Sequence, residues 1–377
     1  MKSILIYSLA LAALTSCSKS EEAITPDNPN NPLPPKEIHI SAAIEASAQT
    51  KATTRADATP LKGPIDGTAD IPGIQFLHKD ATTSEMSGEV LSFDDATLIT
   101  GTRIATGTAT TGGSITFSGS APQYDQKDNK NAYFVAYYPE ATEVSSNVAT
   151  LTIDGKTDIL YAERYDAGSY TSITTNTMTF KHALAQIKVI CKGAADATQG
   201  VIDEVWGKIT KIEIETKAKA TYTYATQKFA YAVSATGGAT SDKLALLGSD
   251  YNALAANGVQ IPAATAAIPT SGSNDEGVIA AGMFAPDDEA SSTAAVKLII
   301  TTQKDSESAV ENNVDVQLMN GVTQAAFISG KTHTVTLTFN SKEKNITVTG
   351  TKVEEWTPGY TGTGSVTPKE NDSSQGS

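Results

Sequence analysis

Cysteine is almost absent from this chain of 377 residues, which contains only Cys17 and Cys191. Cys17 lies in a motif for lipid attachment, described below, and this leaves Cys191 without a partner for an intramolecular disulfide. Cys191 ends an apolar alternation with Ile187 and Val189. We therefore expect a buried structural thiol rather than a reactive one.

Positive charge is also scarce. The chain has 28 Lys and Arg against 42 Asp and Glu, a formal net charge of −14, and its charged residues make up only 19% of the total. This balance argues against nucleic acid as a partner and against electrostatic binding to an acidic membrane surface.

Motifs for catalysis and for metal binding are missing as well. The four histidines show no zinc-site spacing: His39, His78, His182 and His333. No Gly-x-Ser-x-Gly motif occurs, and Gly330-Lys331-Thr332 lacks the upstream glycine of a phosphate-binding loop, because Ala325 stands there. We therefore expect no enzyme activity, no metal and no cofactor. We expect His182 at the edge of the core with a hydrogen-bonded ring.

The N-terminus has the pattern of a lipoprotein precursor. Residues 4–14 are apolar but too few to cross a bilayer as a helix, which takes about 20 residues, so residues 1–16 are predicted to be a signal peptide. Leu14-Thr15-Ser16-Cys17 matches a bacterial lipobox, in which the cysteine is acylated and becomes the first residue. Residues 18–22 resemble the export tag of Bacteroidetes surface lipoproteins. The predicted location is the outer face of the outer membrane, with palmitate or a similar acyl chain on Cys17.

The next segments predict a tether, a strand and a loop. Residues 17–36 carry the acylated cysteine and a proline-rich spacer. Strict alternation then follows, with apolar residues at every second position: Ile38, Ile40, Ala42 and Ile44. Residues 46–58 have no periodicity, so we expect an exposed loop around Arg55. Burial of the three isoleucines contributes roughly 5–9 kcal/mol, comparable to the net stability of a domain.

Most of the remaining chain consists of short strand patterns separated by turns, which favours an all-β fold of sandwiches. We expect an N-terminal β-sandwich over residues 37–192, a linker over 192–207, a C-terminal β-sandwich over 208–356 and a polar tail over 357–377. Within these regions the pattern also favours a strand at 90–93 and a short helix at 244–255. The apolar register shifts near Ala185, which indicates a β-bulge or a passage between two environments.

Several motifs together resemble the fimbrillin family of Bacteroidales, in the Mfa-like branch of type V pilins. They are the lipobox Cys17, the stretch ending at Arg55, residues 134–139 and 158–162, the segment containing Phe180, His182 and Leu184, and the closing Trp356. The resemblance implies two tandem transthyretin-like β-sandwich domains and export as a lipoprotein. It also implies cleavage between Arg55 and Ala56 by an arginine-specific protease. The removed strand would contain Ile38, Ile40, Ala42 and Ile44, and other fimbrillin subunits would be partners by donor-strand exchange.

One departure from that family leaves the role open. Residues 357–377 offer only Tyr360 and Val366 as apolar residues of a C-terminal donor strand. A tip or accessory adhesin, with a host or bacterial surface ligand, therefore fits as well as a stalk subunit. The alternative is a monomeric surface lipoprotein that binds glycan or another ligand without polymerising. Five tyrosines could line a sugar-binding face, but tyrosines on strands more often pack in the core, and we expect packing here: Tyr133, Tyr137, Tyr138, Tyr222 and Tyr224.

Overall fold

The computed structural model describes residues 33–45, 61–65, 67, 69–82, 85, 91–105, 113–234, 240–264, 277–286, 295–320, 323–355 and 362–364. The compact unit Lys36–Ser377 contains every element named below. Within the described ranges we find no helix with the length and hydrophobicity that crossing a bilayer requires.

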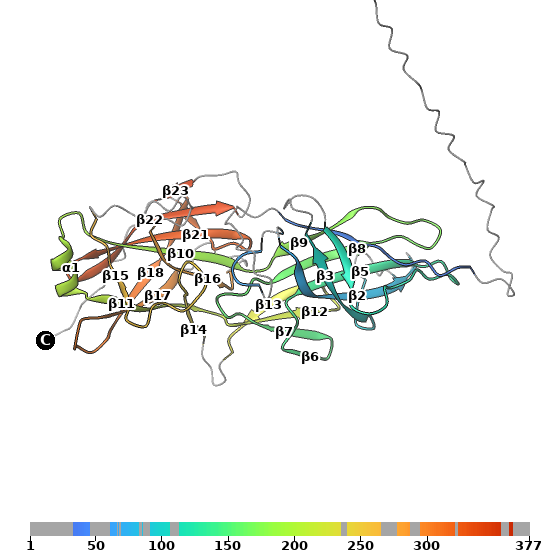
Figure 1. Ribbon diagram of the computed structural model, residues 1–377, viewed down its shortest axis with the longest axis horizontal. Helices are drawn as coiled ribbons and strands as arrows, with labels where there is room; N and C mark the ends of the chain where they lie inside the picture. Colours follow the sequence, from blue (N-terminus) through green and yellow to red (C-terminus); the bar gives the residue numbers. More distant parts are fainter. Residues whose placement is uncertain are drawn as a thin grey trace, which may run out of the picture. The chain divides into compact units, whose positions relative to one another are not determined.

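One sheet closes on itself, and we call it the closed sheet. Its described strands follow the order β1-β4-β3-β2-β5-β8-β9, and β9 pairs again with β1. They are β1 (Ser41–Ile44), β2 (Ile71–Ala81), β3 (Thr97–Ile104), β4 (Gly113–Phe117), β5 (Asn131–Tyr138), β8 (Leu160–Asp166) and β9 (Thr177–His182). Figure 1 shows several of these strands side by side.

The other sheets are open. One has the order β16-β10-β21-β22-β23, with β16 (Val278–Phe284), β10 (Ala185–Gly193), β21 (Lys331–Asn340), β22 (Asn345–Glu355) and β23 (Gly362–Gly364). A second has the order β14-β11-β17-β18, with β14 (Asp242–Ala245), β11 (Lys208–Thr216), β17 (Val296–Gln303), β18 (Val310–Val316) and, beside β11, β15 (Val259–Gln260). A third has the order β13-β12-β7-β6, with β13 (Lys228–Ala232), β12 (Lys219–Thr223), β7 (Val148–Thr152) and β6 (Glu143–Ser145). A hairpin joins β19 (Leu318–Asn320) to β20 (Thr323–Ala325), and α1 (Gln199–Val205) is a short helix.

These elements confirm the all-β fold class. The helix α1 falls inside the expected linker over 192–207, where Ile202 is buried. The pairing of β12 with β7 crosses that linker, since β7 precedes it and β12 follows it. The division into two tandem sandwich domains stays a prediction.

Strand β5 shows how the closed sheet is covered on its outside. Phe134 and Ala136 are buried among the residues inside the closed sheet, whereas Val135 and Tyr137 belong to the large apolar core outside it. Tyr222 of β12 packs on Tyr137 with ring centroids 5.5 Å apart. A strand buried on both faces explains the continuous apolar run in this part of the sequence.

The chain passes between two sheets at Ala183 and Leu184. Strand β9 ends at His182 in the closed sheet, and β10 begins at Ala185 in the sheet that contains β16 and β21. This confirms the passage between two environments that the register shift near Ala185 predicted. Cys191, on β10, is buried as expected, and burial raises the pKa of its thiol.

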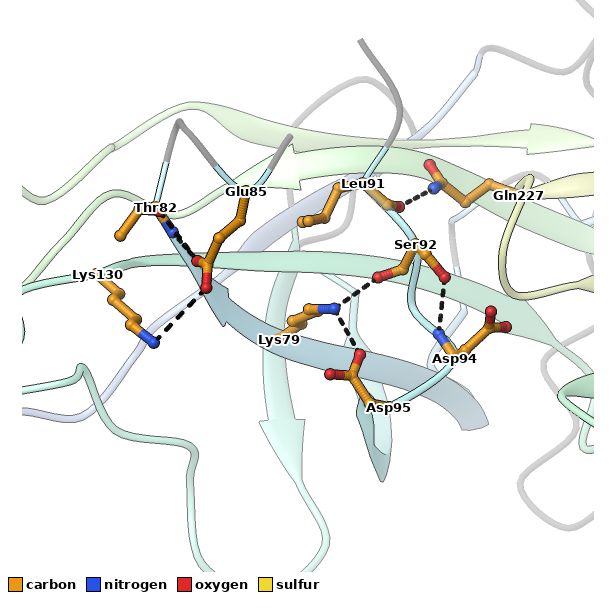
Figure 2. Close-up of polar contacts among 9 residues, drawn as sticks. All are labelled: Lys79, Thr82, Glu85, Leu91, Ser92, Asp94, Asp95, Lys130 and Gln227. Carbon is orange, nitrogen blue, oxygen red and sulfur yellow. Dashed lines mark hydrogen bonds and ion pairs between the residues drawn. The ribbon is translucent and has the colours of Figure 1, made fainter. Parts of the chain in front are cut away.

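The predicted strand at 90–93 is wrong for its described residues 91–93, which are irregular. Their backbone groups bind elsewhere: the carbonyl oxygen of Leu91 accepts a hydrogen bond of 2.6 Å from Gln227 Nε2, and the amide of Phe93 donates to the carbonyl of Tyr224. Figure 2 shows that Lys79 of β2 also ties this segment down, through the carbonyl of Ser92 at 3.0 Å and the carboxylate of Asp95 at 2.5 Å. Tertiary contacts replace the strand ladder here.

The predicted helix at 244–255 is wrong too. Residues 244–245 end β14, and the next backbone amides pair with other strands instead of with their own chain one turn back. The amide of Leu246 donates to Ile212 of β11, and the amide of Leu247 donates to Ala281 of β16, both at 2.8 Å. Pairing with two sheets outweighs the weak helical propensity of this segment.

Candidate functional site at the first strand

Strand β1 has the alternation that the sequence predicted. Ile38, Ile40, Ala42 and Ile44 are between 0% and 4% exposed, whereas His39 and Glu45 are exposed. Side chains of a strand point alternately to opposite faces, so this pattern places four apolar residues inside the closed sheet. The segment is therefore part of the fold and does not lie loose in solvent.

Two neighbours hold β1 by backbone pairing. It runs antiparallel to β4, with Ala42 opposite Gly113, and parallel to β9, with Ala42 opposite Met178 and Ile44 opposite Phe180. Three further bonds extend the pairing beyond β1: Ile38 N to Pro122 O at 2.8 Å, Ile115 N to Ile40 O at 2.9 Å, and Glu45 N to Phe180 O at 2.7 Å. Removal of β1 would open the closed sheet and leave the facing edges of β4 and β9 unpaired.

Arg103 of β3 binds β1 from inside. Its side chain is 0% exposed, its Nε donates to the carbonyl oxygen of Ala42 at 2.9 Å, and its Nη1 donates to the carbonyl oxygen of Gly67 at 2.7 Å. Because β4 lies between β3 and β1, the side chain must pass Gly113. A Cβ atom there would lie 3.1 Å from Arg103 Nε and Cζ and 2.2 Å from the carbonyl oxygen of Ile104, so this passage requires glycine.

Leu61 and Ile65, which follow β1 in the chain, are held by partners outside β1. The amide of Leu61 donates to Tyr138 Oη at 2.7 Å, and the amide of Ile65 donates to Asp158 Oδ2 at 3.1 Å. Burial raises the pKa of Tyr138 to about 12, so its hydroxyl group stays protonated at physiological pH. A break between residues 45 and 61 would therefore separate two segments that have different anchors.

The predicted family-motif residues Phe180, His182 and Leu184 are fully or almost fully buried at this end of the closed sheet. The carbonyl of Phe180 binds the end of β1, as described above. His182 Nδ1 lies 2.7 Å from Asp158 Oδ2, which confirms the hydrogen-bonded ring. The carbonyl of Leu184 accepts a bond of 2.9 Å from Gly330, the turn residue before β21.

Other predicted site residues lie outside the described residues: Cys17, Arg55, Ala56 and Trp356. Sequence reasoning missed Arg103 and Asp158 as site residues. Asp158 begins one of the quoted family motifs, which was a usable signal. Arg103 had a weaker one, since it occupies a buried-side position in an alternating strand where an apolar residue is expected.

The described residues contain no cluster of His, Cys, Asp and Glu with the geometry of a metal site. The five tyrosines that a sugar-binding face would need are buried, at 0% to 5% exposure, and this confirms that they pack in the core: Tyr133, Tyr137, Tyr138, Tyr222 and Tyr224.

Comparison with known proteins gives a sequence match and several structural likenesses. A family model described as fimbrillin-like matches residues 54–356. No curated protein sequence matches the chain. A proposed cell adhesion protein of Bacteroides uniformis is similar in structure, with 18% identity, 85% of this chain and 98% of that chain covered, and a TM-score of 0.49.

Two fimbrial proteins are also similar in structure. A fimbrial protein of Bacteroides vulgatus has 16% identity, with 84% of this chain and 99% of that chain covered and a TM-score of 0.40. The tip fimbrial protein Mfa3 of Porphyromonas gingivalis, with a C-terminal truncation, has 10% identity, with 86% and 100% covered and a TM-score of 0.40. These likenesses are distant, so the sequence match carries more weight.

Proposed function

The chain belongs to the fimbrillin-like family, and we propose that it is a fimbrial subunit or adhesin whose first strand is removed by proteolysis and replaced by a strand of another subunit. The observation that carries this proposal is the position of β1, which completes the closed sheet by pairing with both β4 and β9. The family match spans residues 54–356 and leaves β1 outside it. The match thus begins next to the proposed cleavage site at Arg55, which supports a mature subunit without β1.

Export precedes assembly in this proposal. The lipobox at Cys17 anchors the precursor in the outer membrane by its acyl chains, each buried methylene contributing about 0.8 kcal/mol. The proline-rich spacer then carries β1 away from the lipid. As long as β1 stays in place, the subunit is folded and attached to the membrane.

Cleavage at Arg55 fits the distribution of arginine in the chain, which contains only Arg55, Arg103 and Arg164. Arg103 is completely buried, and Arg164 lies within β8 with its Cζ atom 5.9 Å from the centroid of the Tyr133 ring. A protease binds its substrate as an extended, accessible backbone, and a backbone that is paired within a sheet cannot enter the active site. An arginine-specific protease therefore finds its site at Arg55, between the anchor of β1 and the anchor of residues 61–65.

Loss of β1 creates the site for assembly. The empty groove has an apolar floor and two strand edges, and a strand from another subunit satisfies both: its backbone completes the ladder, and its alternate side chains fill the inward positions. The polar tail over 357–377 makes the chain a poor donor by its own C-terminus. We accordingly assign it to the tip or to an accessory position.

N-terminal sequencing of the protein recovered from the surface of its native cells tests this function. We expect Ala56 as the first residue of the assembled form, and an Arg55→Ala variant should keep its acylated N-terminus and fail to enter denaturant-resistant oligomers. A Lys51→Ala variant, changed in the same segment, should mature normally. Recovery of the protein only as a monomer that begins at Cys17 would contradict the proposal and would favour a monomeric ligand-binding lipoprotein.

A further inference from the structure

The side chain of Arg103 fills a space inside the closed sheet that Gly113 leaves empty. Residues opposite each other on paired strands point to the same face, with Cβ atoms about 5 Å apart. Opposite Ala42 stands Gly113, which has no Cβ, and the guanidinium of Arg103 fills that space at 3.1 Å from the position that a Cβ would take. Position 42 is thus bordered by a buried cationic group in place of an aliphatic neighbour.

The same group contacts β1 and the segment that stays behind after cleavage. Arg103 Nε donates to Ala42 O, and Nη1 donates to Gly67 O. Gly67 in turn packs on Ile44, since a Cβ on it would lie 3.1 Å from Ile44 Cγ1. Arg103 therefore fills the inner space beside position 42, whereas Gly67, which has no side chain, leaves room for the isoleucine at position 44.

We propose that Arg103 determines which strand can occupy this groove: it selects an extended segment of another subunit with the inward pattern large, large, small, large, and it binds the backbone carbonyl of the small residue. This inference rests on the proposed function, because it concerns the groove that β1 leaves. We infer the pattern of the occupant from the segment that is bound there now, which ends in β1. Its inward side chains are Ile38, Ile40, Ala42 and Ile44.

The small residue and Arg103 together determine the register in which a strand can pair with β4 and β9. A slip by one residue turns every apolar side chain to the outside and is already disfavoured by the groove. A slip by two keeps the faces and again presents a carbonyl to Arg103, but it brings an isoleucine to position 42. That side chain collides with the guanidinium over Gly113. Only one register then satisfies both the hydrogen bond and the available space.

The test uses the full chain cut after Arg55 and a fluorescent peptide of residues 37–46, whose binding is followed by anisotropy. The wild-type protein should exchange its own β1 for the peptide. After excess unlabelled peptide is added, an Arg103→Met variant, which keeps length but removes the donors, should release the labelled peptide about 10- to 100-fold faster than wild type, as expected for a lost buried hydrogen bond from a charged group. Arg164→Met is the matched control and should bind like wild type.

Changes in the peptide test the same idea without altering the protein. A peptide with Ala42→Leu should lose binding to the wild-type chain, whereas one with Ala43→Leu, whose side chain points outward, should retain it. If the wild type binds the peptide and Arg103→Met releases it equally slowly, or if both leucine peptides bind alike, the role of Arg103 is overturned while the proposed function stands. If the cut wild-type chain binds no peptide at all, the replaceable strand itself is overturned, and the role of Arg103 with it.

Discussion

The carboxylate of Asp158 lies 2.7 Å from the ring of His182, through Oδ2 and Nδ1, with both side chains almost completely buried. The same oxygen accepts the backbone amide of Ile65 at 3.1 Å. One buried carboxylate thus joins the end of β9 to the segment that follows the proposed cleavage site. The anchor that remains after cleavage is built from the same motif that the sequence singled out at Phe180, His182 and Leu184.

Replacement of Asp158 should destabilise the folded chain strongly. In an Asp158→Ala variant, His182 and the amide of Ile65 lose their common partner inside the protein, and each buried group left unsatisfied costs about 1–3 kcal/mol. We expect the free energy of unfolding, measured by urea denaturation, to fall by about 2–5 kcal/mol. Asp305→Ala, in an exposed turn, should change it by less than about 0.5 kcal/mol.

An equal loss of unfolding free energy in the two aspartate variants would show that Asp158 contributes no more than an exposed charge.

The Asp158→Ala variant should also release residues 61–65 from the surface. Proteolysis with a lysine-specific protease would then cut at Lys62 earlier than in the wild type. Lys62 Nζ itself bonds Asn252 Oδ1 at 3.0 Å, so in the wild type this lysine is held in place.

The alternation in β1 predicts a sharp contrast between neighbouring positions. Ile40→Asp places a carboxylate inside the closed sheet without a partner, at a cost of several kcal/mol, whereas His39→Asp places one in solvent. We expect the first variant to lower the free energy of unfolding of the uncut precursor, measured in urea, by several kcal/mol, and the second to leave it within about 0.5 kcal/mol of wild type. Similar midpoints for both variants would mean that β1 adds little to the stability of the precursor.

His333 predicts a pH dependence of stability. Burial lowers the pKa of this histidine from its usual 6.5 to about 4, and its Nε2 accepts the amide of Ile328 at 3.2 Å. The unfolded chain then binds more protons than the folded chain between pH 6.5 and 4, so this contribution is complete above pH 6.5 and is lost as the pH falls, by at most about 1.4 kcal/mol per unit.

A His333→Gln variant isolates that effect. The difference in unfolding free energy between pH 7 and pH 5 should be smaller in the variant than in the wild type, by about 1–2 kcal/mol. Carboxylates titrate in both proteins and cancel in the comparison. A variant with an unchanged pH profile would show that His333 is protonated equally in the folded and unfolded states.

Local patterns in the sequence predicted the parts of the fold that depend only on the spacing of apolar residues along the chain. The alternation at Ile38, Ile40, Ala42 and Ile44 predicted β1, and the shift near Ala185 predicted the passage between sheets. The helix expected at 244–255 was wrong because backbone pairing with β11 and β16 decides that segment. The helix α1 was missed because its seven residues include Gly200 and form too short a segment to show a helical period.

The sequence by itself determined the all-β class, the inward and outward faces of β1, and the family to which the chain belongs, because periodicity and motifs are properties of contiguous residues. Only the tertiary structure decided that β1 lies between β4 and β9, that Asp158 meets His182, and that Arg103 reaches Ala42 across Gly113. The last two contacts join residues 24 and 61 positions apart, and the pairing of Ala42 with Met178 joins residues 136 positions apart. They depend on which strands become neighbours, and no local pattern contains that information.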